Sequence, residues 1–111
     1  MKISYTDYEH ISVLTLSGDF STDDVEAFER VCTDRMRERT RHILIDCEHL
    51  EFVDSRGLES WIDLQQKLGE KGGQLRLLKP DETIQTILRL TRLTPAFEKH
   101  DSLEQAVRSL R

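Results

Sequence analysis

The residues best placed to do chemistry lie in the segment VDSRGL, residues 53–58. Asp54 and Ser55 follow an apolar run and stand at the start of a predicted helix. A serine hydroxyl or an aspartate carboxylate at such a position accepts a hydrogen bond from an unpaired main-chain N–H group. Capping is therefore the simplest interpretation of Ser55. Because Asp54 can serve as the cap instead, a second interpretation stays open, in which Ser55 is a modification site.

Phosphorylation of Ser55 would have a large electrostatic effect. A phosphoserine carries about −1.5 to −2 charges and several strong acceptor oxygens. Free N–H groups at a helix start tolerate an anion, so the fold need not change. A surface packed against a partner would nevertheless become strongly anionic beside Asp54, and repulsion and desolvation would release that partner. Arg56 is a nearby cation that can pair with the phosphate or redirect partner recognition.

Other chemistries find little support in the sequence. The segment DCEH, residues 46–49, contains metal-ligating residue types, but their spacing is not that of a zinc site and no second pair exists. His10, His42 and His100 are scattered over different predicted elements without a convergent partner set. We therefore predict no metal site, no cofactor and no catalytic residues, which means that the protein is not an enzyme.

Charge and hydropathy restrict the partners and the location. The 111 residues include 21 acidic and 16 basic side chains, for a net charge of −5, which disfavours nucleic acid and anionic lipid as partners. No apolar segment approaches the roughly 20 residues needed to cross a bilayer, and the start has no signal-peptide pattern. We expect a cytoplasmic protein without direct membrane insertion. Cys32 and Cys47 are expected to be reduced, packed thiols.

The first third of the chain predicts two strands and a helix. The segments KISY, residues 2–5, and HISVLTLSG, residues 10–18, are predicted to pair as a hairpin through the polar connection TDYE. Apolar residues on both sides of the second strand predict that both of its faces are at least partly covered. Ser21 or Thr22 is the expected N-cap of the helix that follows.

The remaining segments alternate between strand and helix patterns. HILIDC, residues 42–47, is typical of a central strand buried on both faces. A helix is predicted from Ser55 to about Lys71 with Trp61 in the core, followed by a strand at QLRLL and a helix at PDETIQTILRL. A last helix at DSLEQAVRSL is expected to be capped by Asp101 or Ser102. The order predicts an α/β fold with a mixed sheet of four to five strands, an N-terminal hairpin followed by parallel strands, and about four packed helices.

The central stretch HILIDCEHLEFVDSRGLESWIDLQQKLGEKGGQLRLLKP resembles the STAS domain family, which includes the bacterial anti-sigma-factor antagonists. The similarity extends to LSGDFS before the first helix and to TIQTILRLTRLTPAFEKHDSLEQAV near the end. It therefore covers nearly the whole chain, and we expect a single STAS domain over residues 1–111.

The resemblance implies a phospho-regulated switch that performs no catalysis itself. In antagonists of this family, the serine of an Asp-Ser-x-Gly-Leu element is phosphorylated by a partner kinase of the anti-sigma type, and Ser55 matches that serine. The unphosphorylated form would bind an anti-sigma factor or related serine kinase, the phosphorylated form would release it, and a phosphatase would reset the cycle. The expected partner-binding residues are Phe20, Ser21, Asp54, Ser55, Arg56, Gly57, Leu58 and Glu59. Phe20 is also open to a second interpretation, that it staples the first helix.

Three positions depart from the usual family pattern. Arg56 stands where a small residue is common, Glu59 follows Gly-Leu in place of a small residue, and Ser21 replaces an acid before the first helix. Arg56 and Glu59 leave room for an alternative, a constitutive STAS adaptor such as a cytoplasmic subunit of a lipid-transport ABC system. In that alternative Ser55 is mainly a helix cap.

Overall fold

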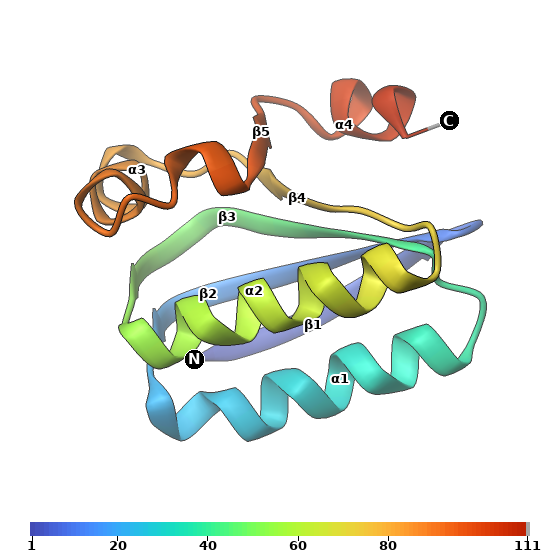
Figure 1. Cartoon of the computed structure of the whole chain (residues 1–111), viewed down its shortest axis with the longest axis horizontal. Coiled ribbons are helices and arrows are strands. Elements are labelled where there is room, and N and C mark those ends of the chain that lie inside the picture. The colour runs from blue at the N-terminus through green and yellow to red at the C-terminus, as the bar shows by residue number, and fades with distance from the viewer. Residues whose placement is uncertain (111) are drawn as a thin grey trace.

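A five-stranded mixed sheet runs through the protein, for which a computed structural model describes residues 1–110 (Figure 1). The strands lie in sequence order, with β1 antiparallel to β2 and the other neighbours parallel. They are β1 (Lys2–Tyr8), β2 (Ile11–Phe20), β3 (His42–Val53), β4 (Leu75–Leu78) and β5 (Glu98–His100). The helices are α1 (Val25–Arg37), α2 (Ser55–Glu70), α3 (Glu82–Leu90) and α4 (Leu103–Ser109), with short 3-10 turns η1 (Thr22–Asp24) and η2 (Thr94–Ala96). The predicted mixed α/β fold is confirmed.

Helices cover both faces of this sheet, and apolar side chains of β2 point to both of these faces. Leu14 and Leu16 point into the larger core, which α1 and α2 close from one side (Figure 1). Ile11 and Val13 point to the other side, into a smaller core with Ala106 of α4. Successive strand residues face opposite sides, so one strand serves two cores. The prediction that both faces of β2 are covered is confirmed.

An aromatic cluster fills the larger core beneath the start of α2. The ring centroids of Phe20 and Phe28 are 4.9 Å apart, and those of Phe20 and Trp61 are 6.2 Å apart. Trp61 also meets Phe97 edge to face at 6.1 Å. These separations lie in the range in which aromatic pairs attract beyond their buried area. Trp61 is fully buried, as predicted.

Two strand boundaries differ from the sequence prediction. The segment expected to form the hairpin turn, residues 6–9, is mostly strand, since β1 continues to Tyr8 and Glu9 makes the turn with a left-handed φ of 57°. The central strand was expected to end at Cys47 but continues to Val53, because its second half pairs with the end of β2. The ladder tolerates this continuation through two register shifts, which bend the strand.

The thiols are packed as expected, whereas the helix starts agree only in part. Ser21 or Thr22 was expected to cap the first helix, but α1 begins at Val25 with Asp24 as its N-cap, after the 3-10 turn η1. Ser21 precedes η1, and its main-chain N–H and hydroxyl donate to the Asp24 carboxylate at 3.1 and 3.2 Å. Ser102, rather than Asp101, caps α4 by accepting a hydrogen bond from the Gln105 N–H group. Cys32 and Cys47 are free and buried. Burial raises the pKa of the Cys32 thiol to about 12, so this thiol stays protonated and unreactive at neutral pH.

Candidate functional site at the start of α2

Ser55 is the first residue of α2 and directly follows the end of β3. Asp54 has an extended backbone and is the N-cap, and its Oδ1 accepts a hydrogen bond from the Gly57 N–H group at 2.9 Å. Ser55 is exposed, and its hydroxyl takes no part in this cap. Of the two interpretations that the sequence left open for the cap, the structure supports the one that assigns it to Asp54.

The second oxygen of Asp54 holds a neighbouring loop in place. Asp54 Oδ2 accepts hydrogen bonds from the Thr22 N–H group at 2.8 Å and from the Thr22 hydroxyl at 3.1 Å. The Asp54 N–H group in turn donates to the Phe20 carbonyl at 3.0 Å. The β2–η1 junction and the β3–α2 junction are thereby joined. Sequence reasoning missed this role of Thr22, since nothing in the sequence connects residues 32 positions apart.

These contacts also determine the charge beside Ser55. Partial burial disfavours the charged form of Asp54, but the hydrogen bonds from Gly57 and Thr22 outweigh it, and the net effect lowers the pKa of the carboxyl below its ordinary value. Asp54 is therefore a carboxylate at neutral pH. A phosphate on Ser55 would add its charge next to this existing anion.

Arg56 and Glu59 form an exposed ion pair next to the serine. Arg56 Nη1 lies 3.3 Å from Glu59 Oε2, and the side chains are 58 and 61% exposed. Pairs as exposed as this contribute little stability, because water competes for both charges. The Arg56 guanidinium can thus exchange its partner at little cost.

Three of the expected partner-binding residues are buried and support the site from below. Phe20 is fully buried and Leu58 is 3% exposed, so neither side chain offers a contact surface in this conformation. A Cβ atom on Gly57 would lie 2.8 Å from Val53 Cγ2 and 3.3 Å from the Phe20 ring, so this position needs glycine. Both side chains belong to the core of the unbound domain, and the expectation that Phe20 and Leu58 take part in partner binding stays a prediction.

The exposed surface around the serine includes apolar residues that the sequence analysis missed. Phe52 and Ile62 are 45 and 38% exposed. Ile62 lies two helical turns after Ser55 on the same face of α2, and Phe52 points away from the buried Val53 because strand neighbours alternate. The helical period of α2 and the alternation along β3 can both be read from the sequence, so the exposure of Ile62 and Phe52 could have been predicted. We call Phe52, Ser55, Arg56, Glu59 and Ile62 the Ser55 surface, which mixes exposed apolar and charged groups.

Two negative findings apply to residues 1–110. No group of three metal-ligating side chains comes together in this part of the chain. None of its helices combines the length and apolar character required to span a membrane.

The arrangement of a hairpin, parallel crossovers and a serine at the start of α2 matches a known family. The STAS domain profile matches residues 2–106. The chain belongs to the STAS domain family. No curated protein matches the chain.

Solved structures with the same fold come from proteins of different kinds. An anti-sigma factor antagonist from Mycobacterium paratuberculosis is 23% identical, with a TM-score of 0.85, 99% of this chain covered and 93% of that one. The anti-sigma factor antagonist SpoIIAA in its unphosphorylated form is 21% identical, with a TM-score of 0.85 and coverage of 99 and 96%. The phosphorylated form of SpoIIAA, from Bacillus, gives a TM-score of 0.77 at 20% identity, with coverage of 99 and 100%. The murine anion transporter Slc26a9 matches at 14% identity and a TM-score of 0.76, covering 95% of this STAS domain but 18% of the transporter. At these identities the likeness concerns the fold.

Proposed function

We propose that this STAS domain is a phospho-regulated protein-interaction switch of the anti-sigma-factor antagonist type. With Ser55 unphosphorylated, the Ser55 surface binds an anti-sigma factor or related serine kinase. That kinase transfers the γ-phosphoryl group of ATP to Ser55 Oγ, the hydroxyl proton is lost and ADP leaves. The phosphorylated domain is then released, and a phosphatase hydrolyses the phosphoserine. The STAS domain itself catalyses no step of this cycle, which we expect to run in the cytoplasm.

One observation carries this proposal: Ser55 is exposed at a helix start where Asp54 already serves as the cap. The hydroxyl is free for transfer, and replacing its proton by a phosphoryl group breaks no cap. Main-chain N–H groups at the first turn of α2 favour an anion there. The existence of SpoIIAA in phosphorylated and unphosphorylated forms with this fold supports the same interpretation.

The release step follows from the charges of the Ser55 surface. Asp54 is already ionised, so phosphorylation concentrates about −2.5 to −3 charges at two neighbouring positions. A partner that packs against the apolar Phe52 and Ile62 would have to desolvate that charge to remain bound. Arg56 can exchange Glu59 for the phosphate and so retain part of the charge within the domain.

The direct test is phosphorylation by the cognate kinase. Incubation with kinase and ATP, followed by intact-mass measurement, is expected to show one added phosphate that is absent in Ser55→Ala. Ser4→Ala serves as the control, because it removes an exposed hydroxyl from β1, outside the expected partner-binding residues, and should leave the added phosphate unchanged. Phosphorylation at another residue, or none at all, contradicts the site assignment.

The alternative function is a constitutive STAS adaptor whose binding does not depend on phosphate. The Arg56–Glu59 ion pair favours it, since it places a bulky charged pair where the family commonly has small residues. Affinity for the physiological partner separates the two functions. A switch predicts that Ser55→Asp weakens binding strongly, whereas an adaptor predicts that it does not.

A further inference from the structure

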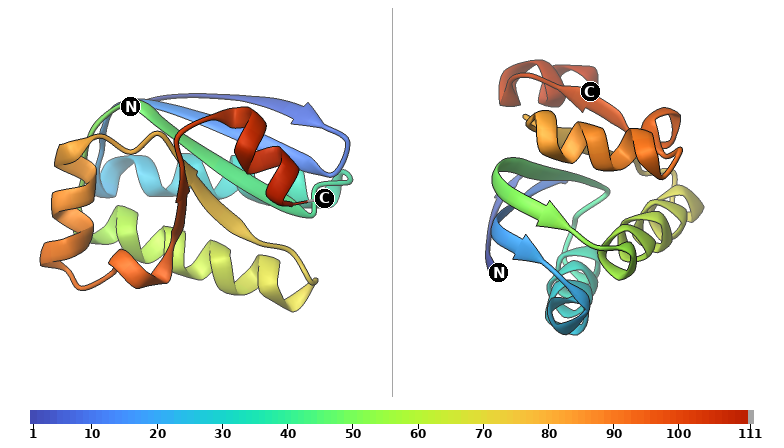
Figure 2. Two further views of the ribbon diagram at one scale, coloured as in Figure 1. Left: turned by 90° about the horizontal axis from the view of Figure 1, so that it is seen from above. Right: turned by 90° about the vertical axis from the view of Figure 1, so that its left-hand side faces the viewer.

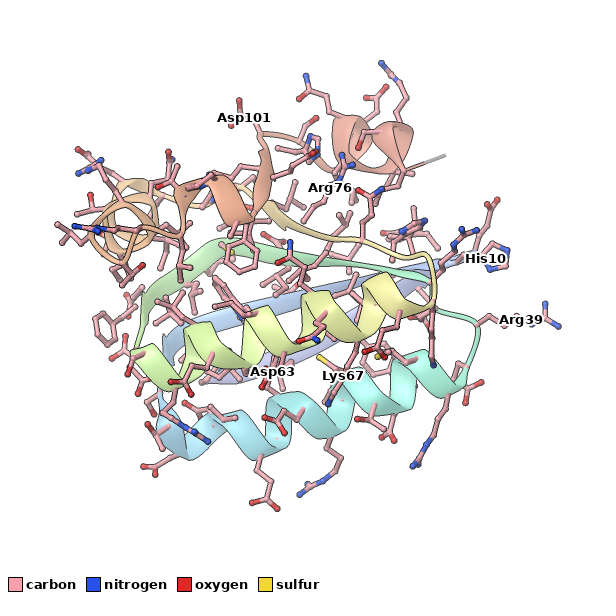
Figure 3. All side chains as sticks on the ribbon, viewed as in Figure 1. His10, Arg39, Asp63, Lys67, Arg76 and Asp101 are labelled. Atoms are coloured by element: carbon pink, nitrogen blue, oxygen red, sulfur yellow. The ribbon has the colours of Figure 1, made fainter. Side chains whose placement is uncertain are left out.

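A groove lies at the end of the molecule opposite the Ser55 surface. It runs between the β1–β2 turn at residues 8–11, the start of β3 at residues 41–42, and α4, and its volume is 370 Å³. Figure 3 shows His10 at this end, far from the start of α2. We call this feature the α4 groove. Its volume falls in the range of about 300–1,000 Å³ that is typical of small-molecule sites.

The floor of the α4 groove is apolar. Ile11 is 6% exposed and belongs to the smaller core, and Leu103, Val107 and Leu110 pack against that core while remaining partly accessible. These side chains come from β2 and from the C-terminal segment, and their accessible parts line the groove. The floor therefore suits an unbranched or aromatic apolar group.

The rim carries hydrogen-bond donors whose orientation is fixed by neighbouring main-chain groups. Arg41 lines the groove, and its Nε donates to the Gly72 carbonyl at 3.2 Å, which anchors the guanidinium. His42 Nδ1 accepts a hydrogen bond from the Gln74 N–H group at 3.0 Å, so in the neutral ring the proton is on Nε2. Burial is the main cause that lowers the pKa of His42, and the positive charge of nearby Arg41 lowers it further. The ring is therefore neutral at pH 7. Nε2–H is then a fixed donor.

The charge of the groove differs from that of the whole chain. The chain carries a net charge of −5, yet Arg41 and two histidines line the groove beside one acid, Glu9. His10 Nδ1 lies 3.2 Å from the Arg39 carbonyl, which can only accept, so this nitrogen carries a proton. With histidines counted as neutral, as in that net charge, Arg41 and Glu9 cancel and the lining carries no net charge. An anionic group there meets one cation and the histidine N–H donors without the net negative charge of the whole chain.

We infer that the α4 groove binds a small amphipathic carboxylate. The carboxylate group pairs with the Arg41 guanidinium and His42 Nε2–H, and the apolar tail lies over Ile11, Leu103 and Val107. The Arg41 cation and the His42 N–H donor select a carboxylate head group, and the apolar floor of the groove selects an apolar tail. The site lies at the other end of the sheet from Ser55, so it is independent of the proposed phosphorylation switch.

Titration of the ¹⁵N-labelled full chain with octanoate tests this inference. Two-dimensional ¹H–¹⁵N spectra are expected to show saturable shifts confined to residues 8–11, residues 41–42 and α4. Octan-1-ol lacks the charge and butanoate lacks the long apolar tail. The affinity of each should therefore be lower than that of octanoate by a factor of about ten or more. Absence of saturable shifts with octanoate, or shifts centred on the start of α2, overturns the inference.

Matched substitutions give the test its specificity. Arg41→Gln should weaken octanoate binding about tenfold or more, because a hydrogen bond to a charged group is lost. Arg39→Gln removes the same charge from an exposed position two residues away and should leave the affinity unchanged. On α4, Val107→Glu should abolish binding by placing a carboxylate in the groove, whereas Gln105→Glu adds the same charge at an exposed position outside the lining. Equal affinities within either pair contradict the site.

Discussion

The two ends of the sheet are built in opposite ways. The residues of the Ser55 surface are neighbours in sequence, and an aromatic cluster packs beneath the start of α2. At the α4 groove three separate segments meet and leave a volume of 370 Å³ unfilled. Figure 2 shows α4 lying across the sheet at the end away from the start of α2.

This difference indicates what each end is suited for. A filled core beneath a helix start holds an exposed serine in a fixed position, which suits the proposed phosphorylation. An unfilled groove between an edge hairpin and a short terminal helix admits a small molecule. Four substitutions at or beneath the start of α2 test the contrast. Three are compared with a residue elsewhere in the molecule, and Asp54→Ala is compared with a conservative change at the same position.

The largest effect is expected from Phe20→Ala. Removing this buried ring leaves a cavity between Phe28 and Trp61, which should cost about 3–5 kcal/mol of unfolding free energy. Tyr8→Ala is the comparison at the groove, where the residue is 45% exposed and the cost should be much smaller. Chemical denaturation measures both. Similar costs would mean that the groove is packed as tightly as the aromatic cluster.

The next effect is expected from Gly57→Ala. Its Cβ atom would lie 2.8 Å from Val53 Cγ2, and relieving this overlap should cost about 1–3 kcal/mol of unfolding free energy. Gly69→Ala lies in the same helix with open space around it and should stabilise by less than about 1 kcal/mol. Thermal unfolding of both variants checks the pair. If both variants were destabilised, the expected gain in helix propensity at Gly69 would be wrong, and the cost at Gly57 could not be assigned to the overlap with Val53.

A smaller effect is expected from Asp54→Ala, which removes the α2 cap and the Thr22 hydrogen bonds. The cost should be about 0.5–2 kcal/mol. Asp54→Asn keeps a capping oxygen without a titrating group and serves as the control.

The same aspartate gives a pH dependence with a definite sign. Because the pKa of Asp54 is lowered in the folded state, the unfolded chain takes up the proton first as the pH falls. The stabilisation is therefore complete above the ordinary value of 3.8 and is lost as the pH falls through the lower, folded-state pKa. Urea unfolding between pH 7 and pH 2 should show the wild type losing its advantage over Asp54→Asn in that window. A constant difference would contradict the ionised cap.

The smallest effect is expected from Ser55→Ala. Since Asp54 is the cap, the change in unfolding free energy should stay within about 0.5 kcal/mol. Ser102→Ala is the comparison at the other end, because the Ser102 hydroxyl accepts the Gln105 N–H hydrogen bond and its loss should cost about 0.5–2 kcal/mol. If Ser55→Ala cost as much as Ser102→Ala, Ser55 would be a cap and the argument for a free hydroxyl would fail.

Sequence patterns predicted which helices and strands form better than they predicted the residues at which each one begins and ends. The helical period placed α2 from Ser55, and the apolar alternation of β2 predicted two covered faces, because both depend on local periodicity. The hairpin turn and the end of β3 were misplaced, because strand length depends on the neighbouring strand. The second half of β3 is polar at several positions and is strand only because β2 pairs with it.

The sequence by itself determined the family, the order of the elements and the position of Ser55 after an aspartate. Whether Asp54 or Ser55 caps α2 was decided only in three dimensions, by the Gly57 and Thr22 groups that converge on one carboxylate. Burial of Phe20 and Leu58, and the meeting of Arg41, His42 and α4 around one groove, were likewise decided there. The physical reason is the same in each case. Periodicity is local, whereas hydrogen-bond partners and solvent exposure depend on residues that are distant in the chain.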